Sequence, residues 1–343
     1  MKALVFYGPG DVRYVDVETP EPRQGEVLIR VKAVSICGSD LSGYKGKSPF
    51  RVPPLIMGHE FSGEIAKLGE GVTGINVGDR VIVETNLYCG ECPNCKAGFV
   101  NICENRKIIG TTMKAGSYNG GMAEYVVAPA NKVIKLPENV SFNAAALIEP
   151  LANVLHAIKH VGSLEGKNVA VYGAGPIGLL TIMSAKYYGA GKVFAMEILE
   201  NRLEMAKECG ADVVINPAKE KASEIVKKMT DGAGADVVFD AVGFAETVRD
   251  SAEMVRNGGT VVWIGLGANT VEIEYKMAVA RELGFKGTYM YITEMVEGVE
   301  ILAKGGMNVE KIITGVYPLS EGPRIFEELA SGKSKDIKVI LYP

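Results

Sequence analysis

The feature that most restricts the fold of this chain is a glycine-rich turn between a predicted strand and a predicted helix. Residues 167–173, KNVAVYG, form a short apolar run typical of a buried strand, and residues 176–190 have helical spacing. The intervening residues match the G-x-G-x-x-G fingerprint of dinucleotide-binding folds: Gly173, Gly175, Pro176, Ile177 and Gly178. The first glycine permits a tight turn, the second lets the backbone approach a pyrophosphate, and the third allows close packing of helix on strand.

An acidic residue stands where such folds bind the adenosine ribose. Glu197 ends the next predicted strand, 192–198, nineteen residues after Gly178. Its carboxylate can accept hydrogen bonds from the ribose hydroxyls and would repel a 2′-phosphate. The sequence therefore favours NAD over NADP, and Arg202 is the nearby residue that could accommodate a phosphate. The alternative is a glycine-rich turn in some other α/β sheet.

Strand and helix patterns continue to alternate after this unit. A helix is predicted at 200–211, with further buried strands at 235–243 and 258–266. Repeated strand–helix–strand units predict a doubly wound parallel sheet, the Rossmann arrangement. Its nicotinamide-facing residues are expected at the ends of the later strands: Val242, Gly243, Ile264, Gly265 and Leu266.

The first half of the chain has a different texture. To about residue 150 it is rich in valine, glycine and proline, and short apolar runs such as 26–34 and 78–84 are bounded by turn residues. This pattern predicts a β-rich domain. A length of 343 residues is consistent with two domains. The last fifty residues predict helices around 294–304 and 321–331, and a final strand.

Charge and hydropathy exclude several classes of function. The net charge is −4 and no block of basic residues occurs, so nucleic acid is not an expected partner. No apolar stretch is long enough to cross a bilayer, and the opening MKALVFYGPG is too short for a signal sequence. We therefore expect a cytoplasmic protein without a membrane partner.

Four of the six cysteines fall inside fifteen residues: Cys89, Cys92, Cys95 and Cys103. Tight C-x-x-C spacing in a reducing compartment favours zinc over a disulfide framework. Four thiolates suit a closed tetrahedral zinc with no position open for substrate. The alternative is four free or partly oxidised thiols.

A second possible metal site is dispersed along the chain, at Cys37, His59, Glu60 and Glu149. A thiolate, an imidazole and a carboxylate can hold a catalytic zinc that keeps one exchangeable position. From spacing alone, a histidine beside a glutamate is more often a satisfied polar pair. His156 and His160 lie in or near a helical stretch and are interpreted as structural.

Taken together, these motifs resemble the zinc-containing medium-chain dehydrogenases across the whole length, most closely the polyol (sorbitol-like) branch. The matching segments, in order, are CGSD at 37–40, GHE at 58–60, the four-cysteine lobe at 89–103, GGMAEY at 120–125, EPL at 149–151 and GAGPIG at 173–178. The resemblance implies a GroES-like catalytic domain of residues 1–153 plus 290–343, and a Rossmann domain of residues 154–289.

The resemblance also implies roles for individual residues. Cys37, His59 and Glu60 would bind catalytic zinc, and Glu149 would be a direct or water-bridged fourth ligand. Asp40 would orient the His59 imidazole. Ser39 would hydrogen-bond the substrate oxygen and begin a proton relay. With the four-cysteine site, the chain would hold two zinc ions.

The implied reaction is oxidation of a secondary alcohol of a polyol or sugar derivative to a ketone, with hydride transfer to NAD. A phosphorylated polyol such as galactitol 1-phosphate, or L-threonine, is the alternative substrate. A zinc- and NAD-binding sensor is the non-enzymatic alternative, whereas zinc-free quinone reductases lack the CGSD and GHE ligands.

Two positions depart from the pattern, and the assembly state is open. Ser42 stands where many relatives have a proton-passing histidine, and Met290 stands where sorbitol dehydrogenases carry a substrate-contacting arginine.

A homo-oligomer is expected, with a tetramer favoured over a dimer.

Overall fold

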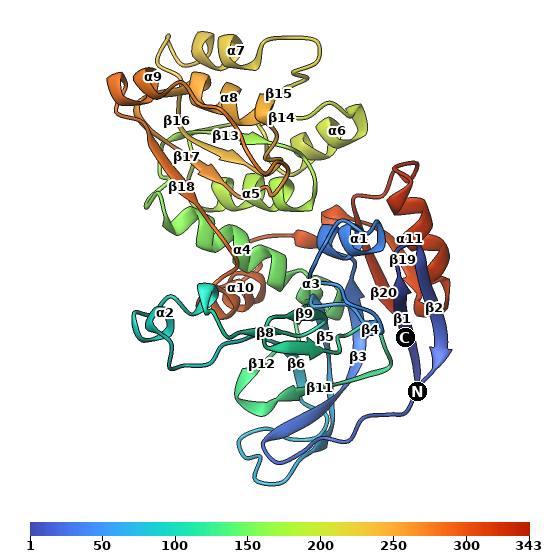
Figure 1. Ribbon diagram of the computed structural model, residues 1–343. Helices are drawn as coiled ribbons and strands as arrows, with labels where there is room; N and C mark the ends of the chain where they lie inside the picture. The colour runs from blue at the N-terminus through green and yellow to red at the C-terminus, as the bar shows by residue number, and fades with distance from the viewer. The chain divides into compact units, whose positions relative to one another are not determined.

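The computed structural model describes residues 1–343 and divides into two compact units (Figure 1). The first comprises Met1–Glu149 and Met295–Pro343, and the second comprises Pro150–Glu294. The chain therefore leaves the first unit, builds the second and returns. The domain limits predicted from the sequence, 153/154 and 289/290 for the catalytic and Rossmann domains, stay predictions.

The second unit is built on a six-stranded parallel sheet in the order β15-β14-β13-β16-β17-β18. Its strands are β13 (Asn168–Tyr172), β14 (Lys192–Met196), β15 (Val213–Ile215), β16 (Ala235–Asp240), β17 (Val255–Trp263) and β18 (Gly284–Gly287). Its helices are α4 (Ile148–Lys159, which begins in the first unit), α5 (Pro176–Tyr187), α6 (Glu200–Glu208), α7 (Ala222–Lys228), α8 (Ala245–Met254) and α9 (Tyr275–Ala280). This confirms the predicted doubly wound parallel sheet.

Helix α5 begins and ends where its sequence dictates. Pro176 occupies the first turn, where its missing N–H costs nothing, and Gly175 precedes it as the N-cap. The residues from Gly178 to Ala185 are all buried, because this helix packs on β13 and β14. It ends at Tyr187, three residues earlier than predicted, and Gly189 then takes a left-handed conformation with φ of 79°.

The first unit is mainly β. Its largest sheet has seven strands in the order β12-β6-β5-β3-β20-β19, with β11 also paired to β3. These strands are β3 (Glu26–Ser35), β5 (Phe61–Leu68), β6 (Arg80–Val83), β11 (Tyr125–Pro129), β12 (Val133–Lys135), β19 (Ile313–Pro318) and β20 (Lys338–Tyr342). The smaller sheets contain β1 (Lys2–Gly8), β2 (Asp11–Asp16), β4 (Leu55–Ile56), β7 (Asn86–Leu87), β8 (Lys107–Ile108), β9 (Thr111–Met113) and β10 (Gly116–Tyr118).

Five helices complete this unit: α1 (Gly38–Tyr44), α2 (Pro93–Lys96), α3 (Phe142–Ala146), α10 (Glu294–Ala303) and α11 (Gly322–Ala330). The core between sheets and helices contains buried side chains from both ends of the chain, such as Phe6, Ile29 and Phe326. The C-terminal segment is therefore integral to this β-rich unit. None of the helices in the structure is both long and apolar enough to span a membrane.

Candidate functional site

Three of the predicted metal ligands lie together in the first unit. The ligand atoms of Cys37, His59 and Glu60 are all within 4.8 Å of one another. Strands β3 and β5 are antiparallel neighbours, and β3 ends at Ser35 while β5 begins at Phe61. The residues that follow β3 therefore emerge beside the residues that precede β5, although more than twenty positions separate them in sequence.

Glycines hold the segment before β5 in place. Gly58 has φ of 98°, which a residue with a side chain rarely adopts, and Gly121 donates its N–H to the Gly58 carbonyl at 2.8 Å. A Cβ on Gly120 would lie 2.2 Å from that same carbonyl oxygen. The glycines in the GHE and GGMAEY motifs therefore allow two backbone segments to approach closely behind the metal ligands.

A lysine from the other end of the chain reaches this cluster. Strand β20 runs antiparallel to β3, with Ile340 opposite Ser35, so Lys338 arrives at the same end of the sheet. The Lys338 ammonium donates to Glu60 Oε2 and, at 3.1 Å, to the Ile36 carbonyl. The Ser35 hydroxyl donates to the same Glu60 oxygen. The side chains of Lys338 and Glu60 are each 2% exposed, so this is a fully buried ion pair.

The chemistry of the cluster fits a divalent metal ion. Burial, and then the negative charges of Glu60 and Asp40, raise the pKa of the Cys37 thiol. The Nδ1 atom of His59 is buried and has no hydrogen-bond partner. Zinc prefers a thiolate, an imidazole nitrogen and a carboxylate oxygen, and its charge would compensate the deprotonated thiol. The donor set and the unpartnered imidazole nitrogen therefore suit zinc.

Glu149 stands apart from these three residues. It lies in the first turn of α4, is 7% exposed, and is not in the group within 4.8 Å. Burial lowers the pKa of Lys338, but the charges of Glu60, Cys37 and Glu149 raise it by more. Glu149 therefore lies near enough to Lys338 for the two charges to interact. Its predicted role as a direct or water-bridged ligand stays a prediction.

The residues after Cys37 form a buried polar network. Cys37 precedes α1 as its N-cap, and its N–H donates to Asp40 Oδ2 at 3.2 Å. Arg51 donates to the other oxygen of Asp40, from Nη2 at 2.7 Å and from Nε at 3.2 Å. Arg51 Nη2 also donates to the exposed Ser39 hydroxyl at 3.0 Å.

This network corrects one sequence-based expectation. Asp40 Oδ1 lies 3.7 Å from His59 Nδ1, which is longer than a hydrogen bond, so Asp40 does not orient the imidazole in this structure. Arg51 occupies that carboxylate oxygen instead. No sequence motif singled out Arg51 or Lys338, because neither belongs to a recognised pattern and each meets its partner only in the fold.

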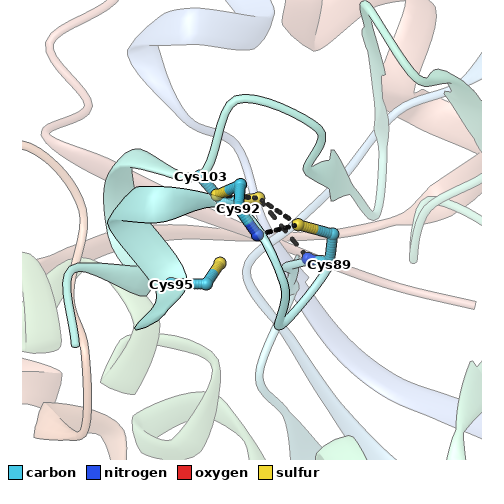
Figure 2. A group of neighbouring side chains, drawn as sticks. All are labelled: Cys89, Cys92, Cys95 and Cys103. Atoms are coloured by element: carbon cyan, nitrogen blue, oxygen red, sulfur yellow. Dashed lines mark hydrogen bonds between the residues drawn. The ribbon is translucent and has the colours of Figure 1, made fainter. Parts of the chain in front are cut away.

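The four-cysteine lobe is also assembled. The sulfur atoms of Cys89, Cys92, Cys95 and Cys103 lie within 4.8 Å of one another (Figure 2), and none forms a disulfide. Hydrogen bonds from the backbone N–H groups of Cys95 and Glu104 lower the pKa of Cys92 to about 6, whereas burial raises that of Cys95 to about 12. A converging set of thiols with backbone donors aimed at the sulfurs suits a closed zinc site.

In the second unit the glycine motif has the geometry that a bound dinucleotide requires. Gly173 has φ of 87°, and a Cβ on Gly178 would lie 1.8 Å from the Gly173 carbonyl oxygen. By contrast, a Cβ on Gly175 would find its nearest neighbour, Arg202 Nη1, 4.0 Å away. Gly175 therefore leaves open space at the N-terminus of α5, where the helix dipole favours a phosphate.

Glu197 follows β14 directly and is held by backbone donors. Its Oε1 accepts from Ile198 N–H at 2.7 Å and Leu199 N–H at 3.2 Å, and its Oε2 accepts from Ala174 N–H at 3.0 Å. Arg202 Nη1 lies 3.8 Å from the same Oε2. The carboxylate is therefore fixed between the glycine turn and the start of α6.

A cavity of about 640 Å³ opens beside this carboxylate. Its lining includes four residues of the predicted cofactor set, Gly173, Glu197, Arg202 and Val242, and also Phe244 before α8. The predicted residues Ile264, Gly265 and Leu266 follow β17 but do not line this cavity, and Leu266 is 86% exposed. A Cβ on Gly243 would lie 2.5 Å from the Gly265 carbonyl oxygen. The loop after β16 and the loop after β17 are therefore in backbone contact.

Asp240 is a residue that the sequence analysis did not identify. It ends β16, is wholly buried, and its Oδ1 accepts the N–H groups of Val242 at 2.8 Å and Gly243 at 2.9 Å. The Thr247 hydroxyl donates to its Oδ2 at 2.9 Å. Asp240 therefore fixes the loop that forms one wall of the cavity. The sequence held one signal for this role: an aspartate at the end of a predicted strand, shortly before Val242 and Gly243.

Comparison with known proteins identifies both units. The family described as "Alcohol dehydrogenase GroES-like domain" matches residues 23–138, and "Zinc-binding dehydrogenase" matches residues 176–304. The chain is 36% identical to D-arabitol-phosphate dehydrogenase of Enterococcus avium, over 99% of this chain and 97% of that protein. It is 37% identical to a probable D-xylulose reductase A of Neosartorya fischeri, over 96% and 94%.

A solved structure shares the whole fold. A protein described as a "putative zinc-binding dehydrogenase", from Sinorhizobium meliloti and with NADP bound, superimposes with a TM-score of 0.92 at 32% identity. The match covers 100% of this chain and 99% of the other.

Proposed function

The chain belongs to the zinc-containing medium-chain alcohol dehydrogenases, and from this premise we propose that it oxidises a secondary alcohol of a polyol or sugar derivative to a ketone, with NAD as hydride acceptor. The observation that carries the proposal is the convergence of Cys37, His59 and Glu60, with an exposed serine, Ser39, whose backbone N–H lies 3.5 Å from Cys37 Sγ. An electrophilic site beside a hydroxyl that can carry a proton is what alcohol oxidation requires.

Cys37, His59 and Glu60 would hold the catalytic zinc, with Glu149 as a further direct or water-bridged ligand. Zinc bound there would supply Lewis acidity toward the substrate hydroxyl, which lowers the pKa of that hydroxyl. The chain's own residues fix the ligands: Lys338 and Ser35 hold one oxygen of Glu60, so its carboxylate is restricted in direction. Ser39 would accept the proton of the substrate hydroxyl.

The second unit would bind the dinucleotide at the carboxyl ends of its strands. Gly173, Gly175, Pro176, Ile177 and Gly178 would receive the pyrophosphate, and Glu197 the adenosine ribose. Ile264, Gly265 and Leu266, together with Val242 and Gly243, would lie toward the nicotinamide half. A bound nicotinamide would supply the hydride acceptor.

We propose NAD as the preferred cofactor because Glu197 is a preformed anion at the ribose position. Its two oxygens already accept three backbone N–H groups, so the carboxylate is fixed in direction. A 2′-phosphate would approach this charge directly. The competing feature is Arg202, and the relative solved with NADP shows that this fold can accept the phosphorylated cofactor.

Phosphorylated polyols are the second candidate substrates. The Enterococcus relative is named for a sugar-alcohol phosphate and the Neosartorya relative for a free ketose, and the identities of 36% and 37% are nearly equal. The metal ligands act on the reacting hydroxyl in either case. The distinction therefore depends on groups that contact the far end of the substrate.

The test is a screen of NAD reduction across free polyols, sugar acids, phosphorylated polyols and threonine, using zinc-loaded protein. The proposal predicts that the highest kcat/KM belongs to a free polyol or sugar acid. A preference for a phosphorylated polyol would transfer the function to the second candidate, and turnover of primary alcohols alone would refute both.

Three further proposals concern the whole protein. The four-cysteine lobe would bind a second, structural zinc, so the zinc content would be two per chain. The free thiols are consistent with the cytoplasmic location predicted from the sequence. Homo-oligomerisation, with a tetramer favoured, would be measured by light scattering.

A further inference from the structure

Arg51 contacts the proposed proton carrier through a buried ion pair. Its guanidinium donates to Ser39 Oγ at 3.0 Å while the same Nη2 atom donates to Asp40 Oδ1 at 2.7 Å. The side chains of Arg51 and Asp40 are 3% and 0% exposed, whereas Ser39 is exposed. One buried cation therefore joins a fixed carboxylate to an exposed hydroxyl two residues after Cys37.

The surrounding chain accommodates Arg51 specifically. A Cβ on Gly43 would lie 2.3 Å from Arg51 Cγ, so the absence of a side chain at position 43 leaves room for the arginine stem. Its Nη1 donates to the Phe50 carbonyl at 3.2 Å, and its Nε gives a second bond to Asp40. With its stem enclosed and its nitrogens engaged, the guanidinium has one orientation.

This orientation limits what the Ser39 hydroxyl can do. A serine hydroxyl has two lone pairs and one proton, and Arg51 already occupies one lone pair. One acceptor site is left for the hydroxyl of an alcohol substrate, and the serine proton is left for water. Arg51 itself cannot take up a proton, since a guanidinium stays charged at every pH at which proteins fold.

We propose that Arg51 is a positioning residue for the alcohol-oxidation step, acting through Ser39 by filling one acceptor site and directing the serine proton outward to solvent. The inference rests on the proposed function. The substrate O–H bond breaks and its proton bonds to Ser39 Oγ, while the original serine proton passes to a water molecule. The electron pair stays on the substrate oxygen, and serine is regenerated unchanged. The route needs no histidine at Ser42.

The competing explanation is that Arg51 only neutralises the buried Asp40 carboxylate. Losing either partner of a buried pair leaves an unpaired charge and destabilises the fold, so reduced activity alone would not distinguish the two roles. The variant Arg51→Lys distinguishes the two roles. Lysine keeps the positive charge beside Asp40 but lacks the planar guanidinium that reaches both Asp40 and Ser39.

The experiment is a double-mutant cycle of Arg51→Lys with Ser39→Ala, measured as kcat in zinc-loaded protein. Ser39→Ala should lower kcat by about 100-fold, the scale of one lost proton-transfer group. Arg51→Lys should lower it about tenfold in the wild-type background and by less than about twofold in Ser39→Ala, because coupled residues are non-additive. Ser39→Thr, which keeps a hydroxyl, should restore the sensitivity to Arg51→Lys.

Controls separate folding from chemistry. Zinc content, melting temperature and the dissociation constant for NAD should stay near wild type in Arg51→Lys. Arg256→Lys, at the Arg256–Asp236 pair of the second unit, should leave kcat unchanged. If Arg51→Lys folds poorly, the neutral pair Arg51→Gln with Asp40→Asn replaces it, because that pair leaves no buried charge unpaired.

The proposal would be overturned if Arg51→Lys lowered kcat by the same factor in the wild-type and Ser39→Ala backgrounds. A fall in kcat that parallels a fall in zinc content would also overturn it. The cycle is calculated from ratios to wild type. Additive losses in an enzyme that oxidises polyols would therefore reject the role of Arg51 and leave the proposed function standing, whereas the substrate screen tests that function independently.

Discussion

The ammonium group of Lys338 lies against the carboxylate of Glu60, 278 residues away along the chain, and both side chains are only 2% exposed. The pairing of β20 with β3 creates this contact, so the metal-ligand cluster depends on the C-terminal strand. Residues at the two ends of the chain thus jointly determine the direction of one candidate zinc ligand.

The first prediction concerns this ion pair. Lys338→Met should lower the free energy of unfolding by about 3–5 kcal/mol, because it leaves the Glu60 carboxylate buried without its cation. Adding Glu60→Gln should recover part of the loss. Urea unfolding of zinc-free protein measures both variants without a contribution from metal. Equal stability of Lys338→Met and wild type would contradict a buried, charged pair.

The second prediction concerns Glu294, whose carboxylate is 3% exposed. It lies 3.2 Å from His156 Nδ1 and 3.1 Å from Lys159 Nζ, and it accepts the N–H groups of Ile292 and Thr293. Burial acts to raise its pKa, but these hydrogen bonds lower it by more, so the net pKa is below the usual range. A lowered pKa means that the unfolded chain binds the proton more readily than the folded chain.

Glu294 therefore stabilises the fold above the ordinary glutamate pKa of about 4.3, and this contribution is lost as the pH falls toward the lower folded pKa. Glu294→Gln should destabilise the protein at pH 7 and progressively less in acid. Melting temperatures from pH 3 to 7 measure the difference. Glu300→Gln, at an exposed pair with Lys304, is the matched control and should change little. A pH-independent difference for Glu294→Gln would count against this interpretation.

The sequence predicted the second unit well because its fold is specified locally. The strand–turn–helix at Gly173–Gly178 and the acid Glu197 lie within one short segment, and the periodicities of strand and helix are directly visible there. The four-cysteine lobe was predictable for the same reason, since all its sulfur atoms come from fifteen residues.

The site in the first unit was harder to predict from the sequence, because its contacts join residues far apart along the chain. Cys37, His59 and Glu60 were found through short motifs, yet Lys338 reaches them only through strand pairing across most of the chain. Arg51 illustrates a second limit: the CGSD motif suggested an Asp40–His59 contact, and only the folded geometry places an arginine on that oxygen. A sequence pattern names the ligands but does not give competing partners.

The third prediction tests cofactor preference at Glu197. Glu197→Gln keeps one oxygen, which can accept from Ile198 and Leu199 N–H, but loses the acceptor for Ala174 N–H and the charge that would repel a 2′-phosphate; Arg202 remains nearby. The ratio of kcat/KM for NAD to that for NADP should fall by at least about tenfold, roughly the loss of a single charge-assisted hydrogen bond. Arg202→Gln should raise the same ratio. An unchanged ratio in both variants would place discrimination elsewhere.

The last prediction separates the two metal sites. Cys95→Ser removes one of four converging sulfur atoms, and structural zinc contributes directly to folding free energy. This variant should lose one zinc per chain and melt at lower temperature while keeping turnover per folded molecule. Cys209→Ser, at a buried cysteine outside both clusters, should keep both zinc ions.

Cys37→Ser and His59→Ala should have the reverse effect, with a near-normal melting temperature and kcat reduced by at least about 1,000-fold, since the Lewis acid is lost from the chemical step. Glu149→Gln distinguishes a direct ligand, whose loss removes zinc, from a water-bridged one, whose loss slows turnover with zinc retained. Zinc content, melting temperature and kcat measured side by side decide among these outcomes. Near-normal turnover in Cys37→Ser would refute the metal site, because no other thiol lies within reach of His59 and Glu60.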